Sequence, residues 1–229
     1  MPLVLQPFGP QRVFERSDSD YFPEASDMEF RLTYEGELKS DGGAKHKHEI
    51  RREFRPQLQA YWGMHPYLKT ANAVVETSAR PRRFKEVNPS LRDYLADQHQ
   101  HNGYKFVPLV TANLSLACGL DILFMRPSMP GEIMKSGDID GRLKTLFDAL
   151  RMPIPKAELG GYDVPLPDET PFDVLLEDDK LITHVSVTTD VLLQPTGRSP
   201  SLVNDARLVI AVTIKPVNQG WHNINFGGA

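Results

Sequence analysis

Apolar and polar residues alternate along several stretches of this chain, which is the pattern of a β-strand with one buried face. The alternation is clear in residues 28–34, which read Met-Glu-Phe-Arg-Leu-Thr-Tyr, and it recurs through residues 111–126. Further strands are predicted at 104–109, 181–193 and 207–217. Each of these segments is short and bounded by turn-forming residues, so the pattern favours a sheet with one face packed against helices.

Other segments carry apolar residues at helical spacing. In residues 44–62 the apolar positions recur every three or four residues, which predicts an amphipathic helix, although Pro56 inside it predicts a kink or a break. A second helix is predicted at 90–99 and a third at 139–151. The apolar stripe of the third helix is formed by Ile139, Leu143, Leu146, Phe147 and Leu150. Strands placed around a central helix predict an α+β fold with a small mixed or antiparallel sheet.

The remaining segments define the expected domain organisation. Residues 1–27 contain four prolines and no sustained periodicity, which predicts an N-terminal arm. Residues 28–217 are expected to form a single domain, interrupted by a proline-rich insertion at about 152–171 and by a loop at 127–137. Residues 218–229 are expected to form a loose C-terminal tail.

Composition narrows the class of protein. The chain has 229 residues, of which 40% are hydrophobic, so it can bury a sizeable core, and its net charge is −4. Its one cysteine, Cys118, excludes an intrachain disulfide and a zinc site built from several cysteines. Because the sequence shows neither a signal peptide nor an apolar stretch long enough to span a membrane, a cytoplasmic protein without membrane contact is expected.

Two acidic segments carry the candidate chemistry. Asp138 and Asp140 open the predicted third helix, and Lys144 follows one turn later. A second group, Glu177–Asp179, precedes the predicted strand at 181–193. If these carboxylates converge, they repel one another by about 4 kcal/mol per pair at 4 Å unless a cation lies among them. Carboxylate oxygens are ligands for hard cations such as Mg²⁺, and a lysine beside them can stabilise charge on a phosphate.

The string Gly137-Asp138-Ile139-Asp140-Gly141-Arg142-Leu143-Lys144, followed by Glu177-Asp178-Asp179, resembles the core of the RusA-type Holliday-junction resolvases. The resemblance covers about residues 112–217. It implies that Asp138, Asp140 and Asp179 are the essential acids and Lys144 the essential lysine. Asp178 matches an accessory acid, which we include among the metal ligands. In this chain Gly141 replaces the family's usual asparagine, the insertion has no counterpart in the smallest members, and the family's N-terminal signature is absent.

This resemblance implies a specific function. Members of the family are homodimeric endonucleases that bind Mg²⁺ through aspartates and cut four-way DNA junctions symmetrically. The chain is therefore expected to be an endodeoxyribonuclease that cleaves branched DNA, with Mg²⁺ or alternatively Mn²⁺ as cofactor and with a second copy of itself as partner.

Basic residues that could bind the DNA backbone lie in two clusters. Contacts between such residues and phosphates release counterions and give affinity that does not depend on sequence. The first cluster is on the predicted helix at 44–62 and the second is in the segment that precedes the helix at 90–99. The predicted DNA-binding residues are Lys45, Lys47, Arg51, Arg52, Arg80, Arg82, Arg83 and Lys85.

Simpler interpretations exist for each motif. Asp138 alone could be a helix N-cap, Asp140 and Lys144 a solvated pair, and residues 177–179 a turn. Asp138–Gly141 also matches the nucleophile motif of haloacid-dehalogenase-like phosphatases, although that family places the motif at the end of a buried strand. A non-catalytic DNA-binding or interaction protein with the same fold is a third alternative. The histidines show no metal-binding spacing, and His46, His48, His99 and His101 are expected at solvated positions.

Overall fold

The computed structural model describes residues 28–77, 83–127, 138–218 and 223–226. The predicted arm (1–27) and the predicted loop after residue 127 lie outside this part of the chain. The helices are α1 (Ala44–Met64), α2 (Pro66–Thr70), α3 (Leu91–Gln98) and α5 (Asp138–Leu150). The strands are β1 (Met28–Glu37), β2 (Asn72–Thr77), β3 (Arg83–Ser90), β4 (Gln100–His101), β5 (Tyr104–Val110), β6 (Leu116–Arg126), β7 (Phe172–Leu176), β8 (Ile182–Val191) and β9 (Asp205–Pro216). Short 3₁₀ helices are η2 (Lys156–Leu159), η3 (Pro167–Glu169), η4 (Asp179–Leu181) and η5 (Ile224–Phe226).

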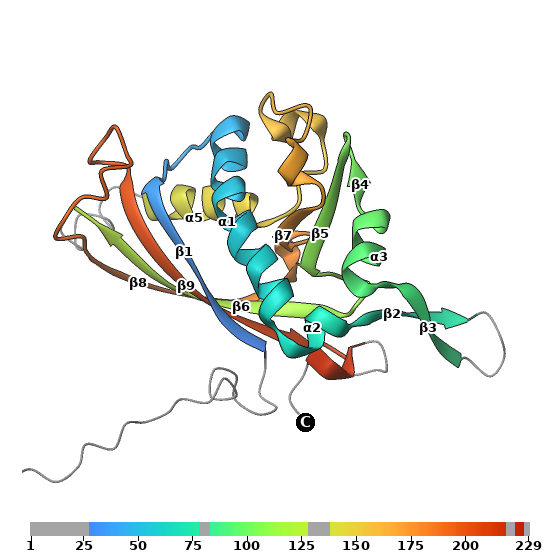
Figure 1. Cartoon of the computed structure of the whole chain (residues 1–229). Helices are drawn as coiled ribbons and strands as arrows, with labels where there is room; N and C mark the ends of the chain where they lie inside the picture. The colour runs from blue at the N-terminus through green and yellow to red at the C-terminus, as the bar shows by residue number, and fades with distance from the viewer. Residues whose placement is uncertain (1–27, 78–82, 128–137, 219–222, 227–229) are drawn as a thin grey trace, which may run out of the picture.

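The main sheet has four strands in the order β1-β9-β6-β8, and it is mixed. β9 pairs antiparallel with both β1 and β6, whereas β6 pairs parallel with β8. A second sheet has the order β4-β5-β7, with β5 and β7 parallel, and β2 and β3 form a separate hairpin. Helices α1 and α5 cover one face of the main sheet, and α1 lies between β1 and β7 (Figure 1). The predicted α+β fold with a small mixed sheet is therefore confirmed.

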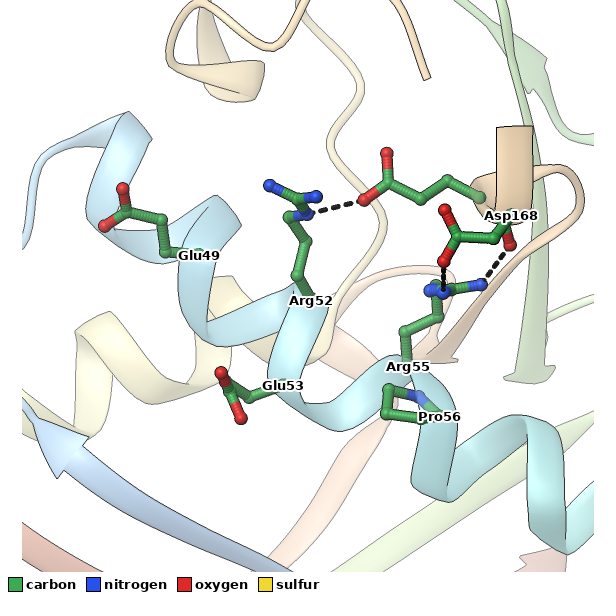
Figure 2. Close-up of a pocket in the computed structure, with 7 residues that line it drawn as sticks. Glu49, Arg52, Glu53, Arg55, Pro56 and Asp168 are labelled. Atoms are coloured by element: carbon green, nitrogen blue, oxygen red, sulfur yellow. Dashed lines mark hydrogen bonds and ion pairs between the residues drawn. The ribbon is translucent and has the colours of Figure 1, made fainter. Parts of the chain in front are cut away.

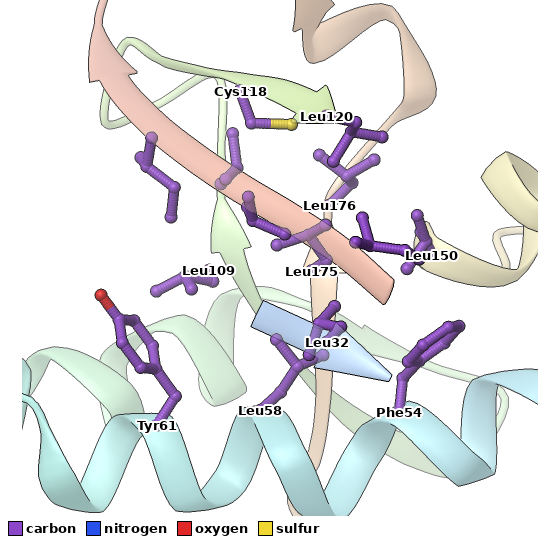
Figure 3. Packing of buried hydrophobic residues seen from close by; sticks show 14 of the residues in the cluster. Leu32, Phe54, Leu58, Tyr61, Leu109, Cys118, Leu120, Leu150, Leu175 and Leu176 are labelled. Atoms are coloured by element: carbon purple, nitrogen blue, oxygen red, sulfur yellow. The ribbon is translucent and has the colours of Figure 1, made fainter. Parts of the chain in front are cut away.

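The core lies between the main sheet and the helices. Inward-facing residues of the strands, such as Leu32 of β1 and Leu120 of β6, are fully buried, and they belong to the same hydrophobic cluster as Phe54 and Leu58 of α1 (Figure 3). Each such side chain contributes about 1.5–3 kcal/mol when it is fully buried. The alternation along the strands and the helical spacing of α1 therefore meet in one hydrophobic cluster.

Helix α1 runs without a break through Pro56, so the break that was one of the two predicted outcomes does not occur. A proline inside a helix removes one backbone hydrogen bond and costs about 3 kcal/mol. Phe54 and Leu58, on either side of the proline, are each 1% exposed, so burial of both halves of the helix offsets that cost. The helix also extends to Met64, after which Pro66 opens α2.

Two strand boundaries also differ from the prediction. Residues 111–115 form a turn in which Ser115 has a φ of 51°, so β6 starts only at Leu116. The segment that was expected to be a basic connector contributes Arg83 and Lys85 to strand β3 instead. The hairpin of β2 and β3 has no clear alternation in the sequence, which is why the pattern did not predict it.

Part of the predicted C-terminal tail is packed against the domain. Phe226 is 1% exposed and its ring meets that of Tyr67 edge to face, with 5.3 Å between centroids. Asn223 is fully buried and donates to the backbone oxygen of Leu114 at 2.9 Å. These residues are therefore a structural part of the domain. In the described part of the chain, no helix combines the length and apolar character needed to cross a membrane.

Candidate acidic site

The first two turns of α5 carry three of the predicted functional residues. Ile139 and Leu143 pack against the core, whereas Asp140 and Lys144 are exposed. Neither Asp140 nor Lys144 forms an ion pair or hydrogen bond with any side chain that the structure describes. Asp138 is the first residue of the helix, and its side chain lies outside the described part. An aspartate and a lysine thus stand free in solvent, one helical turn apart.

The turn between β1 and α1 packs tightly against this part of α5. A β-carbon placed on Gly141 would lie 2.4 Å from the backbone oxygen of Ser40, which is closer than any real contact. The backbone N–H of Gly42 donates to the Thr145 hydroxyl at 3.1 Å in a buried position. The neighbouring backbone therefore leaves no room for a side chain at position 141.

A buried arginine, Arg142, connects the start of α5 to the main sheet. Arg142 is 1% exposed, and its guanidinium donates to the backbone oxygen of Leu38 and, at 3.0 Å, to the side-chain oxygen of Asn204. A further contact reaches the backbone oxygen of Val203 at 3.3 Å. These partners lie at the end of β1 and just before β9. The helix that carries Asp140 is therefore tied to two strands of the main sheet.

The second acidic segment forms the turn before β8. Asp178 is the N-cap of η4, where its carboxylate accepts from the backbone N–H of Lys180 at 3.0 Å and pairs with the Lys180 ammonium at 3.1 Å. These hydrogen bonds hold the pKa of Asp178 below its usual range, so the carboxylate stays ionised. Asp179 is exposed beside it. Glu177 accepts from the backbone N–H of Ala112 at 2.8 Å and is part of the scaffold.

The turn that carries the second acidic segment lies beside α5, the helix that carries the first. α-Carbons of η4 come within 8 Å of α5, and Leu176, just before the acidic segment, forms a β-bridge with Arg151 at the C-terminal end of α5. Asp140 precedes Arg151 by eleven residues, or about 16 Å along a helix axis. No three histidine, cysteine, aspartate or glutamate side chains converge on one point among those the structure describes. Asp140, Asp178 and Asp179 alone therefore do not form a three-ligand metal site.

The donor set still has the chemistry that Mg²⁺ requires. Mg²⁺ prefers oxygen ligands, keeps several waters and is commonly held by one or two carboxylates together with a substrate phosphate. Asp140 is an exposed carboxylate without a described partner, and Asp138 lies two residues before it at the helix start. The positive end of the helix dipole at this point also favours negative charge. The start of α5 can accordingly supply two oxygen ligands.

Most basic residues of α1 are already paired. Lys47 bonds Asp148 of α5 at 2.7 Å, and Arg52 bonds Glu169 of η3 at 2.5 Å. Beside Arg52, Arg55 pairs with Asp168, and both arginines line a groove of about 370 Å³ (Figure 2). Among the four residues predicted to bind DNA on this helix, only Lys45 is exposed, with Glu49 at 4.0 Å.

Arg51 is buried and cannot reach a DNA backbone on the surface. It is 2% exposed, and its guanidinium donates to the backbone oxygens of Arg151 at 2.9 Å and Asp148 at 2.7 Å. The last backbone carbonyls of a helix lack hydrogen-bond donors within the helix. At the C-terminal end of α5, the Arg51 guanidinium is the donor. The structure therefore corrects the expected DNA-binding role of Arg51 to a capping role.

The second predicted basic cluster is described only in part. Arg80 and Arg82 lie outside the described residues. Arg83 and Lys85 lie on β3, opposite Thr77 and Val75 of β2, and their side chains are outside the described part. Their role in DNA binding stays a prediction.

Two histidines that were expected at solvated positions are buried. His48 is fully buried and His99 is 7% exposed. The His48 ring lies among Tyr104, Tyr162 and Phe172, and its Nδ1 accepts from Arg51 at 3.0 Å. Burial and, after it, the nearby arginines lower the pKa of His48 to about 3. His48 is therefore a neutral part of the contact between α1 and the insertion.

We expect this buried histidine to destabilise the protein in mild acid. Its pKa is about 6.5 in the unfolded chain and about 3 in the folded one, so the unfolded state takes up the proton first. The stability that neutral His48 supports is complete above pH 6.5 and declines by about 1.4 kcal/mol per pH unit below it, or about 2 kcal/mol from pH 7 to pH 5. Urea unfolding at both pH values measures this loss.

The matched control for that experiment is a histidine exchange. In His48→Asn an amide oxygen can replace Nδ1 as the acceptor for Arg51, and the loss between pH 7 and pH 5 should shrink. His101→Asn, at a half-exposed position, should leave it unchanged. An equal pH dependence in the wild type and in His48→Asn would contradict the assignment.

Comparisons of this chain with protein-family models, with curated proteins and with solved structures found no match. The structure itself bears on the phosphatase alternative. Asp138–Gly141 form the first turn of a helix, and the nearest preceding strand among the described residues, β6, ends at Arg126. The haloacid-dehalogenase interpretation requires the motif at the end of a buried strand, so this arrangement argues against it.

Proposed function

We propose that this protein is a magnesium-dependent endonuclease that cleaves branched DNA. The observation that carries the proposal is the exposed, unpaired Asp140 and Lys144 at the start of α5. Two other acidic residues on or beside α5 have partners, since Asp148 pairs with Lys47 and Asp178 with Lys180. A rigid helix holds these charges in the fixed geometry that a binding or catalytic site requires.

The chemistry follows from the residue types at the helix start. Asp138 and Asp140 would hold Mg²⁺, which when bound supplies Lewis acidity to a phosphate oxygen and lowers the pKa of water. The Lys144 ammonium would lie beside the same phosphate and stabilise the negative charge that develops on its oxygens. Asp178 and Asp179 would add negative charge beside α5. The resemblance to the junction resolvases, in sequence order and residue type, supports this assignment.

A homodimer belongs to the same proposal. A four-way junction is resolved by two nicks on opposite strands, and one chain offers a single Asp140 and Lys144 pair. Two copies related by a two-fold axis would present two such pairs, so the symmetry of the protein would match the symmetry of the junction.

A specific observation favours a second candidate, a non-catalytic protein that binds branched DNA. The described carboxylates do not converge on one point, and a protein that only binds DNA needs no such convergence. In that case Lys144 would contact a phosphate and Asp140 would play no part in chemistry.

One assay separates these candidates. A labelled synthetic four-way junction, a linear duplex of the same sequence and p-nitrophenyl phosphate are incubated with the protein in Mg²⁺, and the DNA arms are repeated in Ca²⁺ and in a chelator. We expect paired nicks in the junction that depend on Mg²⁺, with the duplex and the small ester left intact. Junction binding without cleavage in Mg²⁺ supports the second candidate, and neither binding nor cleavage rejects both.

Replacement of Lys144 should affect turnover more than binding. In Lys144→Ala we expect kcat on the junction to fall by about 10²–10³-fold, because a charge that acts on the transition state is lost. The Kd for the junction should rise only a few-fold. The control is Lys69→Ala, which removes an exposed lysine from α2, outside the predicted DNA-binding residues. Equal losses in kcat and in affinity would make Lys144 a binding residue instead.

A further inference from the structure

The two outer strands of the main sheet differ in whether other side chains bond to their outward backbone groups. β1 is one edge, and α1 protects it: Gln57 accepts from the backbone N–H of Thr33 at 2.9 Å and donates to its backbone oxygen at 2.8 Å. An outer strand presents unpaired backbone groups, and such groups are a template for another strand unless the protein blocks them. On the β1 side a helix side chain occupies them.

β8 is the other edge, and nothing in the described part of the chain pairs with its outer side. This strand has ten residues, and none of them is buried. Val185 is 41% exposed, and Val187 is only partly buried against the core. Lysine and proline, which commonly protect an edge, are absent from residues 182–191, as are arginine and glycine. From His184 to Val191 the pairing of β8 with β6 is regular, so the outer edge is continuous.

We propose that a second copy of this chain pairs with β8, edge to edge and antiparallel, around a two-fold axis at Val187. This register places Val187 opposite its own counterpart and Val185 opposite Thr189, so residues of one face meet residues of the same face. It also places His184 opposite Asp190 twice, once on each side of the axis. A strand that carries complementary groups at equal distances from its centre fits a symmetric interface.

The charges around His184 agree with this register. Within one chain His184 lies 3.5 Å from Asp121 of β6, and the two carboxylates of Asp121 and the second copy's Asp190 would flank the same ring. Both His184 and Asp121 are largely exposed in the single chain. The pairing would join two four-stranded sheets into one continuous sheet. The inference stands on the sheet edge alone and requires no catalytic activity, but it would also give the proposed endonuclease its second site.

Sedimentation equilibrium on the full chain tests the inference. We expect the wild type to form a dimer, and Val187→Lys and Val187→Glu each to be monomeric, because like charges would face each other across the axis. An equimolar mixture of the two variants should regain the dimer, because lysine then faces glutamate. Arg31→Glu on the protected β1 edge is the control and should stay dimeric.

A cross-link gives a second measurement, and the substitution it requires introduces no charge into the core. Val187→Cys should form a disulfide-linked dimer on mild oxidation, whereas the wild type should not, because its only thiol, Cys118, is buried. A monomeric wild type overturns the inference. A dimer that persists in both charged variants overturns it as well. So does a mixture of the two variants that stays monomeric although circular dichroism shows both variants to be folded. Junction cleavage is assayed separately, so loss of the dimer proposal is distinguishable from loss of the nuclease proposal.

Discussion

Asp140→Asn is expected to abolish magnesium-dependent cleavage of a four-way junction and to leave junction binding nearly unchanged. The substitution keeps the shape of the side chain and removes its negative charge, so a hard cation loses a ligand that it prefers. Because Asp140 is exposed and has no described partner, no structural contact is lost with it. We expect the cleavage rate to fall by about a hundredfold or more, since metal-assisted phosphate chemistry depends on a bound cation.

The experiment needs binding and cleavage measured on the same junction. Binding is followed in Ca²⁺ by fluorescence anisotropy, and cleavage in Mg²⁺ by gel electrophoresis. Asp163→Asn serves as the control, because Asp163 is an exposed aspartate of the insertion that pairs only with Lys156. Full activity in Asp140→Asn would exclude the metal-ligand role, and weakened binding of equal size would indicate a role in DNA contact.

Gly141→Ala is expected to destabilise the protein, although it replaces a glycine inside a helix. Helix propensity alone would give a gain of about 1 kcal/mol. Against it stands the Ser40 backbone oxygen, 2.4 Å from the new methyl group. A backbone atom cannot rotate away as the end of a side chain can, and forced overpacking typically costs about 1–3 kcal/mol or more. We therefore expect a net loss of about 1–2 kcal/mol.

Gly63→Ala is the matched control, because Gly63 also lies in a helix but has open space around its α-carbon. There the propensity term acts alone, and urea unfolding should show a gain of about 0.5–1 kcal/mol. Equal gains at both glycines would mean that the loop at Ser40 yields freely and that the close contact is unimportant. Gly141→Asn, which introduces the residue usual in the junction resolvases that this sequence resembles, should destabilise the protein at least as much as alanine.

Local patterns were sufficient for most of the fold. The alternation through Leu116 to Ile122 predicted β6, and the stripe of Ile139, Leu143 and Leu146 predicted α5 within one or two residues of its ends. Local rules failed where packing outweighed them. Pro56 breaks an isolated helix, but the burial of α1 on both sides keeps it continuous.

The contacts that hold the candidate site in place could not be predicted from the sequence, because the residues that form them are far apart in the chain. Arg142 resembles any charged residue of a solvated helix, and only the fold shows that it is buried against Leu38 and Asn204. Arg51 likewise belonged to a run of basic residues that suggested DNA binding. Its actual partners lie about a hundred residues away, and no local pattern signals such a contact.

The capping of α5 by Arg51 has a mechanical consequence. A guanidinium from α1 that satisfies two backbone oxygens of α5 couples the positions of the two helices, and Lys47 with Asp148 adds a second link between them. The pair should therefore move as a single rigid body. A ligand that binds at the start of α5 would then meet a platform of two helices whose relative position is fixed.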